Sequence, residues 1–178
     1  MEIGKFEFVS TFVLRISDFD YFMDFSFNPQ LQIFFQLLLA AFLGALVGLE
    51  REYKRKEAGM RTYALVCLGA ALFTVLSFKF FEQVAGNLGI SFDPSRVVHG
   101  VAVGIGFLGA GLIVFRKTHI EGLTTAAGLW IVAAIGVAIG LRLYFVAAFT
   151  SFLVIGILSG LRLIEEKFLG TKPEDKLE

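Results

Sequence analysis

Five long apolar runs alternate with short polar segments along this chain, and they cover residues 31–49, 63–81, 97–115, 123–141 and 143–161. An α-helix rises about 1.5 Å per residue, so each run would reach about 28 Å. That length matches the hydrocarbon layer of a bilayer, which is about 30 Å thick. The pattern therefore predicts an all-α membrane protein, a compact bundle of about five transmembrane helices. Only Arg142 separates the last two runs, so four spans with a re-entrant element is the alternative.

Polar residues at the boundaries of these runs predict where the helices begin. Asn28 and Asp93 each precede a proline, which joins a capping side chain to a residue favoured at the first helical position. Thr62 and Thr124 lie at the starts of the second and fourth runs, and we expect their hydroxyls to cap those helices.

The segments outside the apolar runs divide the chain into three parts. Residues 1–28 lack a basic leader and mix acidic with aromatic residues, which predicts an interfacial N-terminal segment rather than a cleavable signal. Residues 29–164 form the expected transmembrane domain. Residues 165–178 are short and charged and are expected to be a cytoplasmic tail.

The distribution of basic residues predicts the orientation in the membrane. With five spans, one side of the membrane receives eleven Lys and Arg residues and the other receives five. Basic residues accumulate on the cytoplasmic side of membrane proteins. We therefore expect a multi-pass protein of the plasma (inner) membrane, with its N-terminus outside and its C-terminus in the cytoplasm.

Composition excludes several classes of function. Hydrophobic residues make up 56% of the chain and charged residues 18%, and 16 Lys and Arg balance 16 Asp and Glu, so nothing in the bulk charge would attract nucleic acid. Catalytic motifs such as HExxH, CxxC and G-x-S-x-G are absent from the sequence. A GxGxxG match at 104–109 lies inside an apolar run, without the strand that a dinucleotide site needs. We expect neither an enzyme nor a bound cofactor.

Glycines are concentrated in the apolar runs, where small residues let helices pack closely. The expected packing positions are Gly44, Gly48, Gly100, Gly104, Gly106, Gly109, Gly111, Gly136 and Gly140, with a further Gly156-x-x-x-Gly160 pair in the last run. On a helical wheel the glycines of the third run fall on two opposite faces, which predicts a helix sandwiched between neighbours. The alternative is a third helix that is broken and exposes carbonyl groups to an ion path.

Three polar clusters supply the candidate functional residues. Between the first two runs, Glu50 and Arg61 are placed to pair at the rim of the bundle, while Lys54, Arg55 and Lys56 read as a solvated basic loop. Before the third run, Asp93, Arg96 and His99 lie near the opposite surface. At the start of the fourth run, Thr125 lies on the same side of a helical wheel as Gly136 and Gly140, so we expect it to face the bundle.

Carboxylates make Glu50 and Asp93 the candidate magnesium ligands, because Mg²⁺ prefers oxygen donors. The predicted topology puts them on opposite sides of a hydrocarbon layer about 30 Å thick, so they would not share one ion. They would flank opposite ends of a path.

Several stretches resemble the MgtC/SapB family of bacterial inner-membrane proteins. They are GLEREY at 48–53, AGMRT at 58–62, DPSR at 93–96, GIGFLGAG at 104–111 and GLTTAA at 122–127. The resemblance implies a compact membrane protein linked to magnesium and ion homeostasis, often described as a magnesium transporter, with Mg²⁺ as substrate or signal. Carried over by position, the motif residues are Glu50, Arg51, Gly59, Arg61, Thr62, Asp93, Arg96, Gly106, Gly109, Gly111, Thr124 and Thr125.

Two readings of function follow from the resemblance and the residues. In the first, the protein is a magnesium transporter or a channel-like protein. In the second, it is a non-transporting regulator that binds another membrane protein, or a second copy of itself, through glycine-rich helix faces. Gly100 and Val103 stand where the family commonly has Gln and Ser, and His99 where it has a small residue. These departures remove polar lining from the third run.

Overall fold

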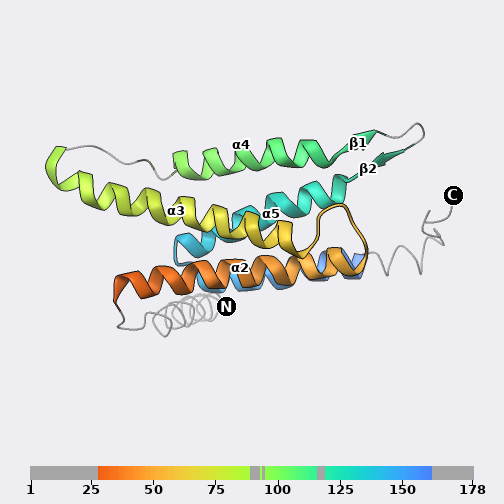
Figure 1. The fold of residues 1–178 in the computed structure, drawn as a ribbon, viewed down its shortest axis with the longest axis horizontal. Helices are drawn as coiled ribbons and strands as arrows, with labels where there is room; N and C mark the ends of the chain where they lie inside the picture. The colour runs from red at the N-terminus through yellow and green to blue at the C-terminus, as the bar shows by residue number, and fades with distance from the viewer. Residues whose placement is uncertain (1–27, 89–92, 94, 116–118, 162–178) are drawn as a thin grey trace, which may run out of the picture.

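The computed structural model describes residues 28–88, 93, 95–115 and 119–161, and it shows a bundle of antiparallel helices (Figure 1). The expected interfacial segment up to residue 27 and the expected tail 165–178 lie outside the described residues. Within them the elements are α2 (Pro29–Tyr53), α3 (Met60–Leu88), α4 (Ser95–Leu112), β1 (Val114–Phe115), β2 (Ile120–Glu121), α5 (Leu123–Gly140), α6 (Tyr144–Gly156) and the π-helical turn η1 (Ile157–Leu161).

The helices define two ends of the bundle. One end, called here the Asn28 end, holds the start of α2, the start of α4 and the turn between α5 and α6 (Figure 1). The other, called the Glu50 end, holds the α2–α3 loop, the β1–β2 hairpin and the start of α5. Among the described helices, four, α2 to α5, are long and apolar enough to cross a membrane. The expected all-α membrane fold is therefore confirmed.

The fifth apolar helix is shorter but extends along the whole bundle. Its described length is 17 residues, Tyr144–Gly160. Near its start, the Tyr144 hydroxyl accepts a 3.0 Å hydrogen bond from Gln36 Nε2 on α2. Near its end, the Leu158 carbonyl accepts one of 3.3 Å from Lys54 Nζ at the Glu50 end. This geometry favours a fifth crossing over a re-entrant element, and Arg142, with φ 64°, makes the tight turn that precedes it.

Two of the expected helix caps are confirmed. The Asn28 side chain accepts a hydrogen bond from the Gln30 backbone N–H, with Pro29 at the start of α2. Asp93 Oδ1 accepts hydrogen bonds from both the backbone N–H and the hydroxyl of Ser95. Both side chains satisfy N–H groups that a helix start leaves without an intrahelical acceptor.

The two threonine caps are wrong. Helix α3 begins at Met60, two residues before Thr62, and the Glu52 carboxylate accepts the Met60 N–H at 2.9 Å. Helix α5 is preceded by Gly122, so Thr124 lies inside the helix. Gly122 has φ 86°, and a Cβ there would overlap the Leu112 carbonyl oxygen. The tight hairpin after α4 requires glycine at this position. Helix α4 ends at Leu112 rather than at the expected residue 115, because Val114 and Phe115 form strand β1.

Small residues bring α2 and α5 against α3. On α2, a Cβ at Gly44 or Gly48 would overlap α3 atoms, including Cys67 Cβ and Met60 Cα. On α5, Gly136 lies against the Cys67 carbonyl and Gly140 against the Thr74 side chain. Helix α3 therefore occupies the centre of a tightly packed group, and its residues Tyr63, Cys67 and Ala71 are fully buried.

Helix α4 does not pack as expected. It is a continuous α-helix, so the reading in which it is broken is wrong. It is also not sandwiched, because a Cβ at Gly100, Gly104, Gly106 or Gly111 would have no neighbouring atom within 4 Å. Gly109 is the one α4 glycine with a neighbour at this distance, Ala126 on α5. Gly156 and Gly160 likewise meet nothing within 4 Å. A helical wheel gives the faces of one helix but not which faces have neighbours.

Candidate functional site

Polar side chains from α2, the α2–α3 loop, α3 and α5 meet at the Glu50 end. We call this set the Glu50 cluster, and its members are Glu50, Arg51, Lys54, Glu57, Tyr63 and Thr125. The sequence places these residues in two separate segments, 50–63 and 125. The packing of α5 against α3 brings the two segments together.

Glu50 is the acidic centre of the cluster. Its side chain is 9% exposed, and that of Arg51 is 4% exposed. Arg51 Nε donates to Glu50 Oε2, and Lys54 Nζ forms an ion pair with Glu50 Oε1. Buried charges are tolerated when they are paired, and here two cations compensate one carboxylate. Lys54 is 19% exposed and belongs to this ion-pair network rather than to a solvated loop.

Thr125 and Glu57 join α5 to the α2–α3 loop. The Thr125 hydroxyl, which is buried, donates a 2.7 Å hydrogen bond to Glu57 Oε2. This hydrogen bond is the main reason that the pKa of Glu57 lies below its ordinary value of 4.5. A donor that stabilises the ionised carboxylate lowers its pKa. Glu57 is thus held as an anion at neutral pH.

Tyr63 makes a second connection to the same residue. Its hydroxyl donates a 3.1 Å hydrogen bond to the Thr125 carbonyl, and its side chain is fully buried. A Cβ at Gly128 would overlap that hydroxyl. Tyrosine buried in an apolar region needs a partner for its O–H group, and Gly128 leaves the space that allows this contact.

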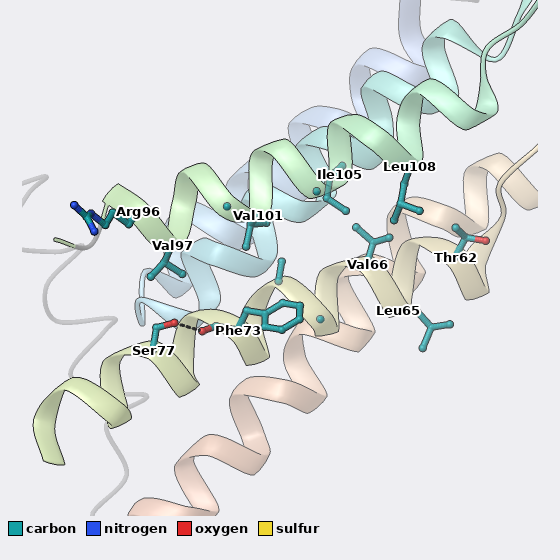
Figure 2. Close-up of a pocket in the computed structure, with 14 residues that line it drawn as sticks. Thr62, Leu65, Val66, Phe73, Ser77, Arg96, Val97, Val101, Ile105 and Leu108 are labelled. Carbon is teal, nitrogen blue, oxygen red and sulfur yellow. Dashed lines mark hydrogen bonds between the residues drawn. The ribbon is translucent and has the colours of Figure 1, made fainter. Parts of the chain in front are cut away.

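A different feature lies between α3 and α4, where a groove of about 710 Å³ separates the two helices (Figure 2). Val97, Val101 and Leu108 extend into it from α4 toward α3 (Figure 2). Gly69, Gly100 and Gly104 also line it and leave it open, since a Cβ at any of them would meet no atom within 4 Å. The walls are apolar apart from Thr62, Ser77 and Arg96, and the Ser77 hydroxyl donates to the Phe73 carbonyl of its own helix.

Arg96 lies at the mouth of this groove, at the Asn28 end. Its side chain is 88% exposed and lies 4.0 Å from Asp93 Oδ2, at the limit of an ion pair. Asp93 has a pKa below its ordinary value, mainly because the Ser95 side chain hydrogen-bonds to it. The Asp93 carboxylate therefore both caps the start of α4 and lies at ion-pair distance from the Arg96 guanidinium, which is largely exposed.

The remaining candidates are separate from both features or only border them. Arg61 is exposed and does not pair with Glu50, which uses Arg51 and Lys54 instead. Thr124 and His99 are exposed. Thr62 is also exposed, and it lines the groove where the groove reaches the Glu50 end of the bundle. Glu50 lies near the end of α2 and Asp93 directly precedes the start of α4, and these two helix ends lie at opposite ends of the bundle (Figure 1). Among the described residues, no three His, Cys, Asp or Glu side chains gather in a metal-binding group.

Sequence reasoning missed Glu57, Tyr63 and Gly128. A signal for Tyr63 was present, because a tyrosine in an apolar run needs a hydrogen-bond partner. Glu57 gave no comparable signal, since it stands among charged loop residues and only the tertiary structure shows its partner.

Together, the apolar helices, the glycine-packed centre and the charged Glu50 end define a polytopic helical membrane protein. The chain belongs to the MgtC family, whose family model matches residues 37–167. This confirms the resemblance described above.

Curated relatives share substantial identity with the chain. It is 44% identical over 109 residues to the protein named "Putative magnesium transporter YhiD" of Escherichia coli K12, covering 61% of this chain and 51% of that protein. It is 40% identical to Protein SrpB of Synechococcus elongatus, covering 80% and 84% of the two chains. It is 44% identical to Protein MgtC of Salmonella typhimurium LT2, covering 59% and 42%. The chain spans about half the length of the YhiD and MgtC proteins. No solved structure matches it.

Proposed function

We propose that this protein serves magnesium homeostasis in the plasma membrane as a regulator that binds another membrane protein through α4. Membership of the MgtC family and the name of the YhiD relative support the link to magnesium. The observation that carries the regulatory reading is the weak packing of α4. Two of its 18 residues are buried, against nine of 18 in α5.

The proposed contact is the face of α4 that points away from both α3 and α5. Gly106 and Ala110 are exposed one helical turn apart, beside Val103 at 60% and Phe107 at 81% exposure. A pair of small residues at this spacing allows a second helix to approach closely within a membrane. We call these four residues the outer α4 face.

Purification in mild detergent tests this reading. We expect wild-type protein to retain a membrane partner, and Gly106→Leu to lose it and to fail in restoring growth at low magnesium to a strain that lacks the gene. Gly156→Leu on α6 is the matched control, because Gly156 also meets nothing within 4 Å. Equal partner recovery and equal growth with Gly106→Leu and Gly156→Leu would contradict the proposal.

Transport is the second candidate, and the buried Glu50 carboxylate is the observation that favours it. Glu50 lies in the last turn of α2, and buried ionisable residues on membrane helices often mark ion pathways or their entrances. Proteoliposomes with a magnesium gradient separate the two readings. Flux that Glu50→Gln abolishes would support transport and count against the regulator. Absence of flux from folded protein would exclude transport.

The proposed orientation puts the Glu50 end in the cytoplasm, because the segments at that end of the bundle carry most of the Lys and Arg residues. Single cysteines placed at Arg55 and at Ser95 in a Cys67→Ala background test it. We expect a membrane-impermeant thiol reagent applied to intact cells to label the cysteine at 95 and not the one at 55.

A further inference from the structure

We propose that the α3–α4 groove binds one anionic phospholipid, with its phosphate at Arg96 and an acyl chain along the apolar walls. This site is separate from the outer α4 face and does not depend on the proposed regulatory function. The argument rests on the groove's lining, its length and the charge at its mouth.

The lining fits a hydrocarbon chain. Val66 and Phe73 on α3 and Val101 and Leu108 on α4 border the groove (Figure 2). The three lining glycines have no neighbour within 4 Å, so no side chain from the described part of the chain fills the space beside them. Its volume of about 710 Å³ falls in the range of roughly 300–1,000 Å³ that is typical of small-molecule sites.

The length of the groove fits a lipid better than a transmembrane helix. From Val97 to Leu108 its α4 wall rises about 17 Å, and from Thr62 to Ser77 its α3 wall rises about 22 Å. One leaflet of the hydrocarbon layer is about 15 Å thick and the whole layer about 30 Å. The groove is thus long enough for an acyl chain from one leaflet and shorter than a crossing helix needs.

The charge at the mouth selects the headgroup. Arg96 is 88% exposed at the start of α4, where a bilayer surrounding the helices would place its lipid phosphates. The helix start that Asp93 caps carries a positive partial charge, which partly offsets that carboxylate. The Arg96 guanidinium lies 4.0 Å from Asp93 Oδ2 but remains largely exposed, and its planar donors suit a phosphate.

Native mass spectrometry of the full chain in an uncharged detergent tests the proposal. The protein is titrated with an equimolar mixture of phosphatidylglycerol and phosphatidylcholine that carry the same acyl chains. We expect one retained lipid and a preference for phosphatidylglycerol of about fivefold, which corresponds to about 1 kcal/mol. Arg96→Gln should keep a lipid but lose the preference. Lys79→Gln is the matched control, because Lys79 is paired with Glu82 and does not line the groove.

Filling the groove tests the acyl-chain half of the site. Gly104→Leu would fill the groove from its α4 wall, and Gly69→Leu would fill it from its α3 wall. If one variant does not fold, the other still tests the site. Each should lose the retained lipid whatever its headgroup. Undiminished lipid retention in the folded variants would overturn the proposal. So would an unchanged headgroup preference in Arg96→Gln, or a wild-type protein that retains a second copy of itself in place of lipid.

Discussion

The Thr125 hydroxyl on α5 donates a 2.7 Å hydrogen bond to the Glu57 carboxylate of the α2–α3 loop, joining two segments that are 68 residues apart in the chain. This contact belongs to the Glu50 cluster, together with the ion pairs of Glu50 and the hydrogen bond from Tyr63. The cluster holds the loop against the start of α5. Its residues therefore offer direct tests of how the Glu50 end is stabilised.

Replacing Thr125 with valine should destabilise the protein by about 1 kcal/mol, because it removes a hydrogen bond to a charged group while preserving the shape. The low pKa of Glu57 means that this bond contributes fully above pH 4.5 and is lost as the pH falls through the lowered folded-state value. Melting temperatures in detergent should therefore differ most near neutral pH and converge in acid. A constant difference from pH 7 down through the acid range would refute the assignment.

Gly128 and Tyr63 should behave as a coupled pair. Gly128→Ala places a methyl group against the Tyr63 hydroxyl and should be clearly destabilising, since the neighbouring helices are closely packed. Tyr63→Phe removes that oxygen and should cost about 1 kcal/mol by itself. In the double variant, Gly128→Ala should cost less than it does alone. The check is a double-mutant cycle on unfolding free energies, and simple additivity would rule out the contact.

Gly136 should tolerate no larger residue. A Cβ there would overlap the Cys67 backbone carbonyl, which cannot move without displacing α3. We expect Gly136→Ala to cost about 1–3 kcal/mol, measured as a lower melting temperature or as loss of monodisperse protein on size exclusion. Gly111→Ala, where nothing lies within 4 Å, should be close to neutral. Equal effects at the two positions would argue against the packing of α5 on α3.

Removing the Glu50 carboxylate should leave Arg51 buried without compensation. We expect Glu50→Ala to destabilise the protein by about 3 kcal/mol, the scale for breaking a buried pair. Combining it with Arg51→Met should recover part of the loss, because no unpaired charge then remains. Glu82→Ala, which breaks the exposed pair with Lys79, should cost less than about 0.5 kcal/mol. The measurement is the unfolding free energy in detergent of the wild type, the two single variants and the double variant. A double variant less stable than Glu50→Ala would contradict this explanation.

The sequence by itself determined the elements that depend on local chemistry. The apolar runs gave the helices, since hydrocarbon requires each backbone polar group to be satisfied within its segment. The caps at Asn28 and Asp93 follow from neighbours two residues away. The motif stretches were sufficient to indicate the MgtC family.

Only the tertiary structure decided which side chains meet. The glycines of α2 and α5 pack against α3, whereas four on α4 with the same local appearance meet nothing within 4 Å. The partner of Thr125 lies 68 positions earlier in the chain, and Lys54 is paired rather than solvated. Hydropathy fixes that a helix forms and how long it is, but its rotation and neighbours depend on how all the helices fit together, which no local pattern contains.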